Sequence, residues 1–187
     1  QSGATFARRF QTNTLETIDD DDLLTALHPF ISQGWPITTV DGGTDRIFME
    51  PDAQRAIIEL SCGEPFLFQL AGQCAWHAST DSIITAEHVR TGWSRQAVHE
   101  AEAHVQRILD RLPPREREFV EAMAELAPEE RSLTNIANRL GHKKATDAGP
   151  TAQRLDLTRR IIRRGRPYRF QHRAVGAYLT SEWPEVG

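Results

Sequence analysis

Proline, serine and glycine divide the stretch from 113 to 173 into short segments, and this division constrains the fold strongly. Residues 113–126 begin with two prolines and continue with apolar residues at helical spacing. Ser132 precedes a second amphipathic segment that stops at Gly141, and Pro150 opens a third. Serine caps helix starts, proline suits the first helical turn, and glycine suits the residue after the last turn. The sequence therefore predicts three short helices.

A short hairpin and a last helix are predicted after the third helix. The segment IIRRGRPYRF, at 161–170, has apolar residues at both ends and a turn at Arg164-Gly165. The final amphipathic segment is AVGAYL. Helix, helix, helix and hairpin is the order of a winged helix, in which the second and third helices form a helix-turn-helix. We expect Tyr168 and Phe170 to belong to the core of the hairpin.

The first part of the chain is predicted to be helical in short pieces after an initial strand. Residues 5–18 suit an extended strand, and Asp19 to Asp22 suit the first turn of a helix that ends near Gly34. The residues from 35 to 43 have the composition of a loop. Further helices are expected at 50–60, from Pro65 onward, and at 85–112. The predicted fold class is mainly α.

The composition is that of an ordinary globular protein. The chain has 187 residues, 39% of them hydrophobic and 26% charged, with a net charge of −4. No apolar run approaches the ~20 residues that span a bilayer, so we expect no membrane partner and a cytoplasmic location. The two cysteines, Cys62 and Cys74, lack a metal-binding or redox spacing, and we expect reduced thiols.

The sequence contains no recognisable catalytic centre or metal site. The segment HEAEAH resembles a zinc-binding HExxH motif, but His99 and His104 are five residues apart. Five residues rotate a helix by ~500°, which turns the two rings ~140° away from each other. A phosphate-binding GxxxxGK[ST] loop is missing as well. We therefore assign no catalytic residue and no metal ligand to this chain.

A basic block is the most informative charge feature. Residues 139–173 contain eleven Lys or Arg against two Asp, a net charge of +9, which leaves −13 for the rest of the chain. Arginine binds phosphate and guanine edges with its planar fork. Two interpretations stay open: contact with nucleic acid, or docking on a protein or on the acidic first part. The candidate nucleic-acid-binding residues are Arg154, Arg159, Arg160, Arg163, Arg164, Arg166 and Arg169.

The segment Gly63-Glu64-Pro65 precedes a helix that is apolar nearly all round. The simpler interpretation is that Gly63 terminates one helix and Pro65 starts the next. The alternative is that this helix start faces a ligand, because the exposed amides of a helix N-terminus attract anions. Spacing alone favours the simpler interpretation.

The chain contains, in this order, ARRFQTNTLETIDDDDLLTAL, GEPFLFQLAGQCAW, ITAEHV, LDRLPPREREFVEAMAEL, IANRLG and YRFQHRAVGAYL, and these six segments together resemble a known family. The chain is similar to the region that follows the nucleotide-binding core of AAA+/STAND P-loop ATPases, of the archaeal-ATPase and replication-initiator-like group. The resemblance extends over nearly the whole chain.

This resemblance implies a division into three regions. Residues 1–18 would be the tail of an ATPase core that is absent from this chain, 19–104 a helical lid domain, and 105–187 a winged-helix domain. Gly63 and Pro65 would border the adenine or ribose of ATP. The cofactor would be ATP with Mg in the full-length protein, which would be an ATPase, and we expect none for this fragment alone.

The implied function is that of a C-terminal regulatory fragment. It would couple the nucleotide state of the missing N-terminal core to DNA or protein binding, with Ala97 to Leu112 as the moving linker. One alternative is a stand-alone winged-helix DNA-binding transcription regulator, because LPPREREF followed by IANRLG also resembles response-regulator helix-turn-helix domains. A third is a protein-interaction module.

Overall fold

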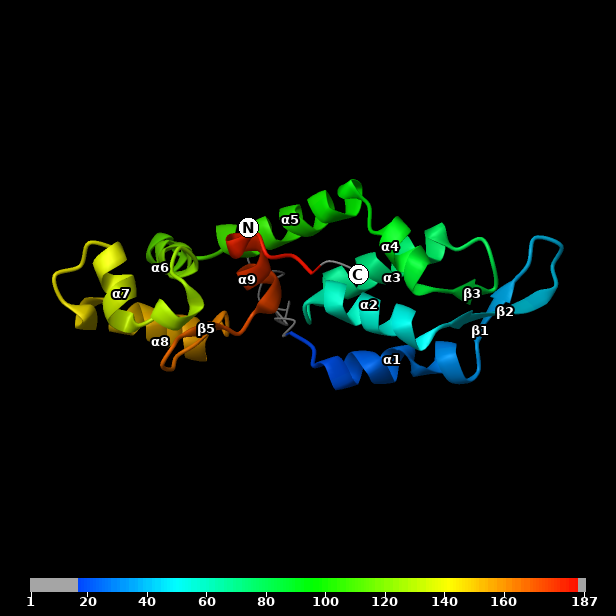
Figure 1. Ribbon diagram of the computed structural model, residues 1–187, viewed down its shortest axis with the longest axis horizontal. Helices are drawn as coiled ribbons and strands as arrows, with labels where there is room; N and C mark the ends of the chain where they lie inside the picture. The colour runs from blue at the N-terminus through cyan, green and yellow to red at the C-terminus, as the bar shows by residue number, and fades with distance from the viewer. Residues whose placement is uncertain (1–16, 185–187) are drawn as a thin grey trace, which may run out of the picture.

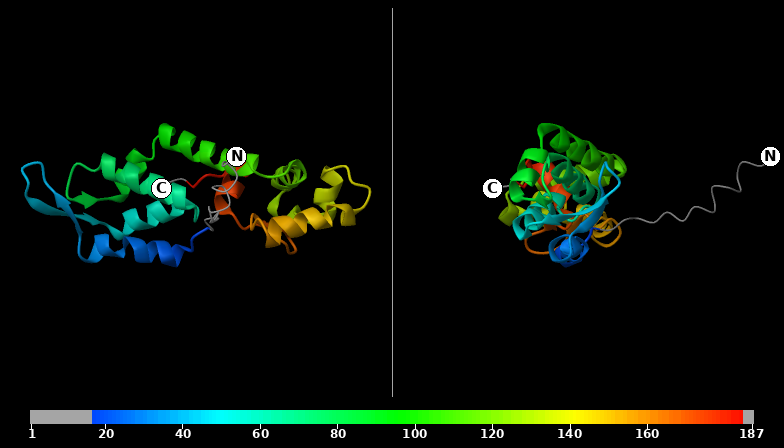
Figure 2. Two further views of the ribbon diagram at one scale, coloured as in Figure 1. Left: turned by 180° about the vertical axis from the view of Figure 1, so that it is seen from behind. Right: turned by 90° about the vertical axis from the view of Figure 1, so that its right-hand side faces the viewer.

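The computed structural model describes residues 17–184, and it shows an elongated, mainly helical molecule (Figure 1). The predicted fold class is confirmed. The view from behind shows the same elongated outline, and the view along the long axis shows a narrow cross-section (Figure 2). The predicted strand at 5–18 and the predicted core tail at 1–18 lie outside the described residues, except for Thr17 and Ile18, which are in no strand.

The N-terminal part of the molecule, residues 17–92, combines helices with a small sheet. Its elements are α1 (Asp20–Ser32), β1 (Trp35–Thr38), β2 (Thr44–Met49), α2 (Pro51–Ser61), α3 (Pro65–Ala78), β3 (Ile83–Ile84) and α4 (Ala86–Gly92). Thr85 caps α4 with its side chain, which accepts a hydrogen bond from the backbone of His88.

A long helix, α5 (Arg95–Asp110), leads from this part into the C-terminal part, residues 114–184 (Figure 1). Ser132 caps α7 and Gly141 follows it with φ +72, both as predicted. Helix, helix, helix and hairpin is the observed order. The elements are α6 (Pro114–Ala124), α7 (Leu133–Arg139), α8 (Gly149–Leu157), β4 (Ile162–Arg163), β5 (Arg169–Phe170) and α9 (Arg173–Thr180).

The prediction of a loop at 35–43 was wrong for Trp35–Thr38, which form β1 and pair with β2 in an antiparallel hairpin, whereas the residues from 39 to 43 form the turn between the two strands. Its register pairs Trp35 with Ile47 and Thr38 with Thr44. The Arg46 side chain donates to the carbonyl oxygen of Gly34 at 2.9 Å, which anchors the hairpin to the end of α1. The two glycines after Asp41 provide the turn. We had interpreted this turn chemistry as a loop, although it is equally typical of a hairpin.

The predicted helix at 85–112 is also wrong as a single element, since it breaks between α4 and α5. Gly92 closes α4 against α3, and a Cβ atom there would overlap the carbonyl group of Cys74. Ser94 then precedes the first residue of α5. Close packing of α4 on α3 therefore ends the first helix, and the chain changes direction before α5.

Helix α3 contributes to both hydrophobic cores of the molecule. Ala71 and Ala75 pack in the core of the N-terminal part, whereas Leu67 and Leu70 pack with α5 and the C-terminal part. Helix α5 itself runs across the predicted domain boundary at 104/105. The two parts thus share helices, and α3 is buried on two sides.

The structure also describes the two cysteines and the length of the helices. Cys62 is buried and Cys74 is partly buried, and both are free thiols, as predicted. Within residues 17–184, none of the helices has the length and apolar character needed to cross a membrane.

Candidate functional site at the joint and on the basic wing

The corner at Gly63-Glu64-Pro65 is where α2 ends and α3 begins. Cys62 and Gly63 both have left-handed backbone, with φ values of 48° and 71°, and Pro65 is the first residue of α3. The Ser61 hydroxyl donates to the carbonyl oxygen of Ile58 at 2.6 Å and accepts from the Gly63 amide at 3.1 Å. The interpretation of Gly63 and Pro65 as a helix stop and start is confirmed.

Gly63 is also covered by two other segments of the chain. A Cβ atom at this position would lie 2.9 Å from the carbonyl oxygen of Ile18 and 3.2 Å from the guanidinium of Arg173. The Ile18 amide donates to the Gly63 carbonyl at 2.8 Å. Pro65 is half-buried. The structure thus places this predicted nucleotide-binding pair at a contact between α1, α3 and α9, which we call the joint.

Glu64 lies at the centre of the joint and is only 8% exposed. Its Oε1 lies 2.8 Å from Nε2 of His104 on α5, and its Oε2 lies 3.2 Å from Nε2 of His172 just before α9. Burial raises the pKa of Glu64, but the hydrogen bonds from His172 and His104 outweigh it, so the pKa lies below its usual value. One carboxylate therefore connects α3 to two elements near the C-terminal part.

Both histidine rings are held by their surroundings. The ring of His104 stacks on Phe66, with centroids 4.4 Å apart and planes 12° from parallel. The Nδ1 atom of His172 is buried and has no hydrogen-bond partner. The bond to Glu64 is thus the polar contact that fixes His172, and losing it would leave both ring nitrogens unsatisfied.

An ion pair between helix starts closes the joint. Arg173, the first residue of α9, binds Asp20, the first residue of α1, with Nη1 3.2 Å from Oδ2. Intramolecular pairing of the basic block with the acidic first part was one of our two interpretations. It is confirmed for this residue.

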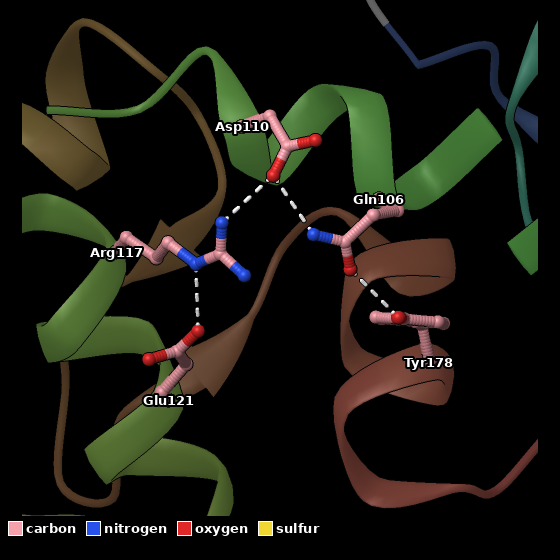
Figure 3. Close-up of polar contacts among 5 residues, drawn as sticks. All are labelled: Gln106, Asp110, Arg117, Glu121 and Tyr178. Carbon is pink, nitrogen blue, oxygen red and sulfur yellow. Dashed lines mark hydrogen bonds and ion pairs between the residues drawn. The ribbon is translucent and has the colours of Figure 1, made fainter. Parts of the chain in front are cut away.

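A second polar cluster fixes the turn between α5 and α6 (Figure 3). Arg117 of α6 donates to Asp110 at 2.7 Å and to Glu121 at 2.8 Å. Asp110 also accepts from Gln106 at 2.8 Å, and Gln106 accepts from the Tyr178 hydroxyl of α9 at 2.7 Å. The end of α5, on which we predicted a moving linker, is therefore tied to both α6 and α9.

Some of the candidate arginines form ion pairs inside the C-terminal part. Arg154 and Arg159 bind the two oxygens of Glu116, with Nε–O distances of 3.0 and 2.9 Å, and the Glu116 side chain is only 3% exposed. Arg164 binds Asp156 at 2.7 Å. Arg160 is engaged in a contact of its own. These side chains stabilise the packing of α6, α8 and the hairpin.

Other arginines of the hairpin stay exposed. We call residues 162–170 the wing. Arg163, Arg166 and Arg169 are exposed there and form no ion pair with any residue between 17 and 184. A groove of about 960 Å³ separates the turn of the wing from the start of α7 at Ser132. The wing thus carries uncompensated positive charge beside a groove.

The wing is held in place by its own core residues. The Tyr168 amide donates to the carbonyl oxygen of Arg131 at 2.7 Å, and the Tyr168 ring is buried. Phe170 is partly buried and packs on the core of the C-terminal part. The prediction that both are hairpin core residues is confirmed.

The structure also shows how the ionisable side chains are distributed. Within residues 17–184, no group of three or more His, Cys, Asp or Glu side chains is arranged to hold a metal ion. His99 is exposed, whereas His104 binds Glu64.

Comparison with known proteins gives one match. A family model described as a domain of unknown function (DUF8462) matches residues 103–166. That range covers the end of α5, helices α6 to α8 and the first half of the wing. No curated protein and no solved structure matches the chain.

Buried charged residues were missed by sequence reasoning. Glu64 was treated only as the residue between Gly63 and Pro65. A signal existed for Glu116, because it precedes Phe119 and Val120 by three and four residues and so lies on the same helix face. No local pattern marks Arg131, since its burial depends on the wing.

Proposed function

We propose that this chain is the C-terminal regulatory region of an ATP-binding protein of the AAA+/STAND type, and that it couples nucleotide state to nucleic-acid binding by the wing. One observation carries the proposal: the Gly63–Pro65 corner directly contacts His172 and Arg173, which lead from the wing into α9. A shift of the corner would therefore move the chain that closes the wing. Such coupling requires that the ligand bind two arrangements with different affinity.

In this proposal, ATP with Mg is bound mainly by a preceding N-terminal core. Pro65, which is half-buried at the first turn of α3, borders the nucleotide, and Gly63 keeps α1 and α9 close to the corner. A movement of α3 would then move α5 and α9 as well, because Glu64 contacts a histidine on α5 and another just before α9. No residue of this chain is assigned a catalytic role.

The wing supplies the nucleic-acid contact in this proposal. Arg163, Arg166 and Arg169 are exposed and uncompensated by any residue between 17 and 184, whereas Arg154, Arg159 and Arg164 are held by buried or half-buried carboxylates. Arginines near phosphate groups release condensed counterions, so binding weakens steeply as salt rises. The structural arginines contribute less to this effect than the wing arginines.

A salt series tests the wing. Binding of a labelled DNA duplex is measured by fluorescence anisotropy for the chain and for the double variant Arg163→Ala, Arg166→Ala. We expect the slope of log affinity against log salt to fall by about two, since each phosphate contact contributes about one. The control is Arg55→Ala, Arg107→Ala, which removes the same charge from the exposed surface elsewhere. Equal slopes for both double variants would show that the wing is not the nucleic-acid face.

The coupling is tested in the protein that contains these residues together with an N-terminal ATP-binding core. DNA affinity is measured with and without ATP and Mg, for the unchanged protein and for Glu64→Gln. We expect a nucleotide-dependent affinity that the variant reduces. DNA binding that is indifferent to nucleotide in the unchanged protein would overturn the coupling and leave DNA binding as a property of these residues alone, as in the alternative of a DNA-binding regulator. The absence of both effects would favour a protein-interaction module.

A further inference from the structure

A cleft of about 500 Å³ lies between the end of α2 and the C-terminal part. Glu59 and Cys62 line it from α2, and Arg131, Arg169 and Phe170 line it from the opposite side. Residues of α9 and of the chain after it complete the wall. A ligand in this cleft would contact both parts of the molecule.

Arg131 is the unusual residue of the cleft, because it is a cation that is only 9% exposed. Its Nε donates to the carbonyl oxygens of Met123 and Leu126, at 3.2 and 3.1 Å, and its guanidinium lies over the Phe170 ring at 5.3 Å from the centroid. Its two terminal nitrogens make no hydrogen bond, and it forms no ion pair, with any residue from 17 to 184. Most of the side chain is buried, but its two terminal nitrogens are not among the fully buried atoms without a hydrogen bond, so they remain accessible to a ligand in the cleft.

Among the negative charges that act on Arg131, that of Glu182 has the largest effect. Glu182 lines the same cleft, and its Oε2 accepts from the Thr180 hydroxyl at 3.0 Å. Burial lowers the pKa of Arg131, and the negative charges of Glu182 and Glu129 offset this only in part. Glu182 thus partly compensates Arg131 without binding it.

The other two arginines of the cleft differ in their partners. Arg173 is bound to Asp20, which neutralises it. Arg169 is exposed and forms no ion pair within the described residues. Arg131 and Arg169 therefore lie on the same wall of the cleft, and neither guanidinium group forms an ion pair with a carboxylate among the described residues. Phe170 and Ala177 add apolar side chains to the lining of the cleft.

We propose that this cleft binds a small organic oxyanion, a phosphate monoester or a carboxylate, between Arg131 and Arg169. The planar fork of a guanidinium suits two oxygens of such a group. The apolar portion of the ligand contacts Phe170 and Ala177, and the oxyanion takes the place of Glu182 as the counter-charge of Arg131. Because the walls come from both parts, the bound ligand stabilises their present arrangement.

Calorimetric titration of the chain with phenyl phosphate, benzoate and inorganic phosphate tests this site. We expect phenyl phosphate or benzoate to bind more tightly than inorganic phosphate, because the ring adds apolar contact. The stronger of the two organic probes identifies the oxyanion. Inorganic phosphate binding as tightly as both would overturn the assignment of an organic ligand, and no binding by any probe would overturn the site.

Variants of exposed residues locate the site without disturbing the buried arginine. Arg169→Gln should weaken the best probe about tenfold, through one lost charge-assisted contact. Glu182→Gln should tighten it about threefold, because it removes a competing charge. The control is Arg163→Gln, since Arg163 pairs with Arg169 in the hairpin register but does not line the cleft. If Arg163→Gln weakened probe binding as much as Arg169→Gln does, the loss would reflect only the lower net charge of the chain, and the proposal would be overturned.

This inference shares Arg169 with the nucleic-acid contact proposed for the wing, and Arg163, which does not line the cleft, separates the two proposals. Arg163→Gln should lower DNA affinity and leave the probe affinity unchanged, so the two proposals fail separately. A DNA duplex added as a competitor should weaken probe binding at most as much as Arg169→Gln does, because Arg169 is the residue that the two sites share. Full competition by the duplex would show that the cleft is part of the nucleic-acid face and overturn its role as a small-molecule site.

Discussion

Oε2 of Glu64 lies 3.2 Å from Nε2 of His172, across the contact between α3 and the segment that leads into α9. The two residues are 108 positions apart in the chain. Together with the contact from Glu64 to His104, this pair makes Glu64 the buried polar centre of the joint. The stability of the folded protein should therefore depend on the ionisation of Glu64 and fall when Glu64 is replaced.

Acid should weaken the joint through Glu64. The pKa of its carboxyl is lower in the folded protein than its ordinary value of 4.5, so the ionised form is stabilised by folding. This contribution is fully present above pH 4.5 and is lost as the pH falls through the folded pKa. Glu64→Gln should destabilise the protein by about 1–3 kcal/mol at neutral pH and flatten the acid side of the stability profile.

Chemical denaturation across a pH series measures this effect. The control is Glu50→Gln, because Glu50 is exposed just before α2. An acid slope that stays the same in Glu64→Gln, relative to the unchanged chain, would contradict the role that we give to the carboxylate.

Replacing Gly63 should cost more than replacing a glycine that has a similar backbone conformation. Gly63→Ala should destabilise by about 1–2 kcal/mol from the left-handed φ of 71°. The clash of its Cβ with the Ile18 carbonyl oxygen, at 2.9 Å, adds to this cost. Gly42→Ala is the matched control, since Gly42 has φ +83 and no atom within 4 Å of the added carbon. Equal losses in denaturant midpoint would show that the close packing at the joint contributes nothing.

Glu116 should matter for both stability and charge. Glu116→Gln leaves Arg154 and Arg159 without their carboxylate, at a cost of about 1–3 kcal/mol of stability. The freed arginines should also raise the affinity for a DNA duplex at low salt. Thermal unfolding and anisotropy measure the two effects. The control is Glu118→Gln on the same helix, an exposed carboxylate that changes the net charge equally. Equal DNA affinities of the two variants would contradict the release of Arg154 and Arg159.

The polar cluster around the α5–α6 turn should contribute a modest amount of stability. Tyr178→Phe removes the hydroxyl that donates to Gln106 at 2.7 Å and should cost about 0.5–1.5 kcal/mol. Tyr168→Phe serves as the control, because its hydroxyl makes no hydrogen bond with residues 17–184. We expect a smaller loss for the control in urea denaturation. The reverse order would argue against the cluster shown in Figure 3 as a stabilising contact.

Local signals predicted much of the C-terminal part. Ser132, Gly141 and Pro150 mark helix ends through their own backbone chemistry, so the helices and the hairpin around Arg164-Gly165 could be located from the sequence. The hairpin of β1 and β2 was missed because its Gly-Gly turn is compatible with a loop as well as with paired strands. The break at Gly92 was missed because it depends on contact with Cys74, which is remote in the chain.

The sequence by itself determined the helical class, the helix starts and stops, and the concentration of positive charge at 139–173, since these depend on residue type and local spacing. Only the tertiary structure decided which charges are compensated. It directed Arg154 and Arg159 to Glu116, joined Arg173 to Asp20, and left Arg131 buried without a carboxylate. Ion pairing depends on distances of a few ångströms between segments far apart in the chain, and local sequence patterns carry no information about those distances.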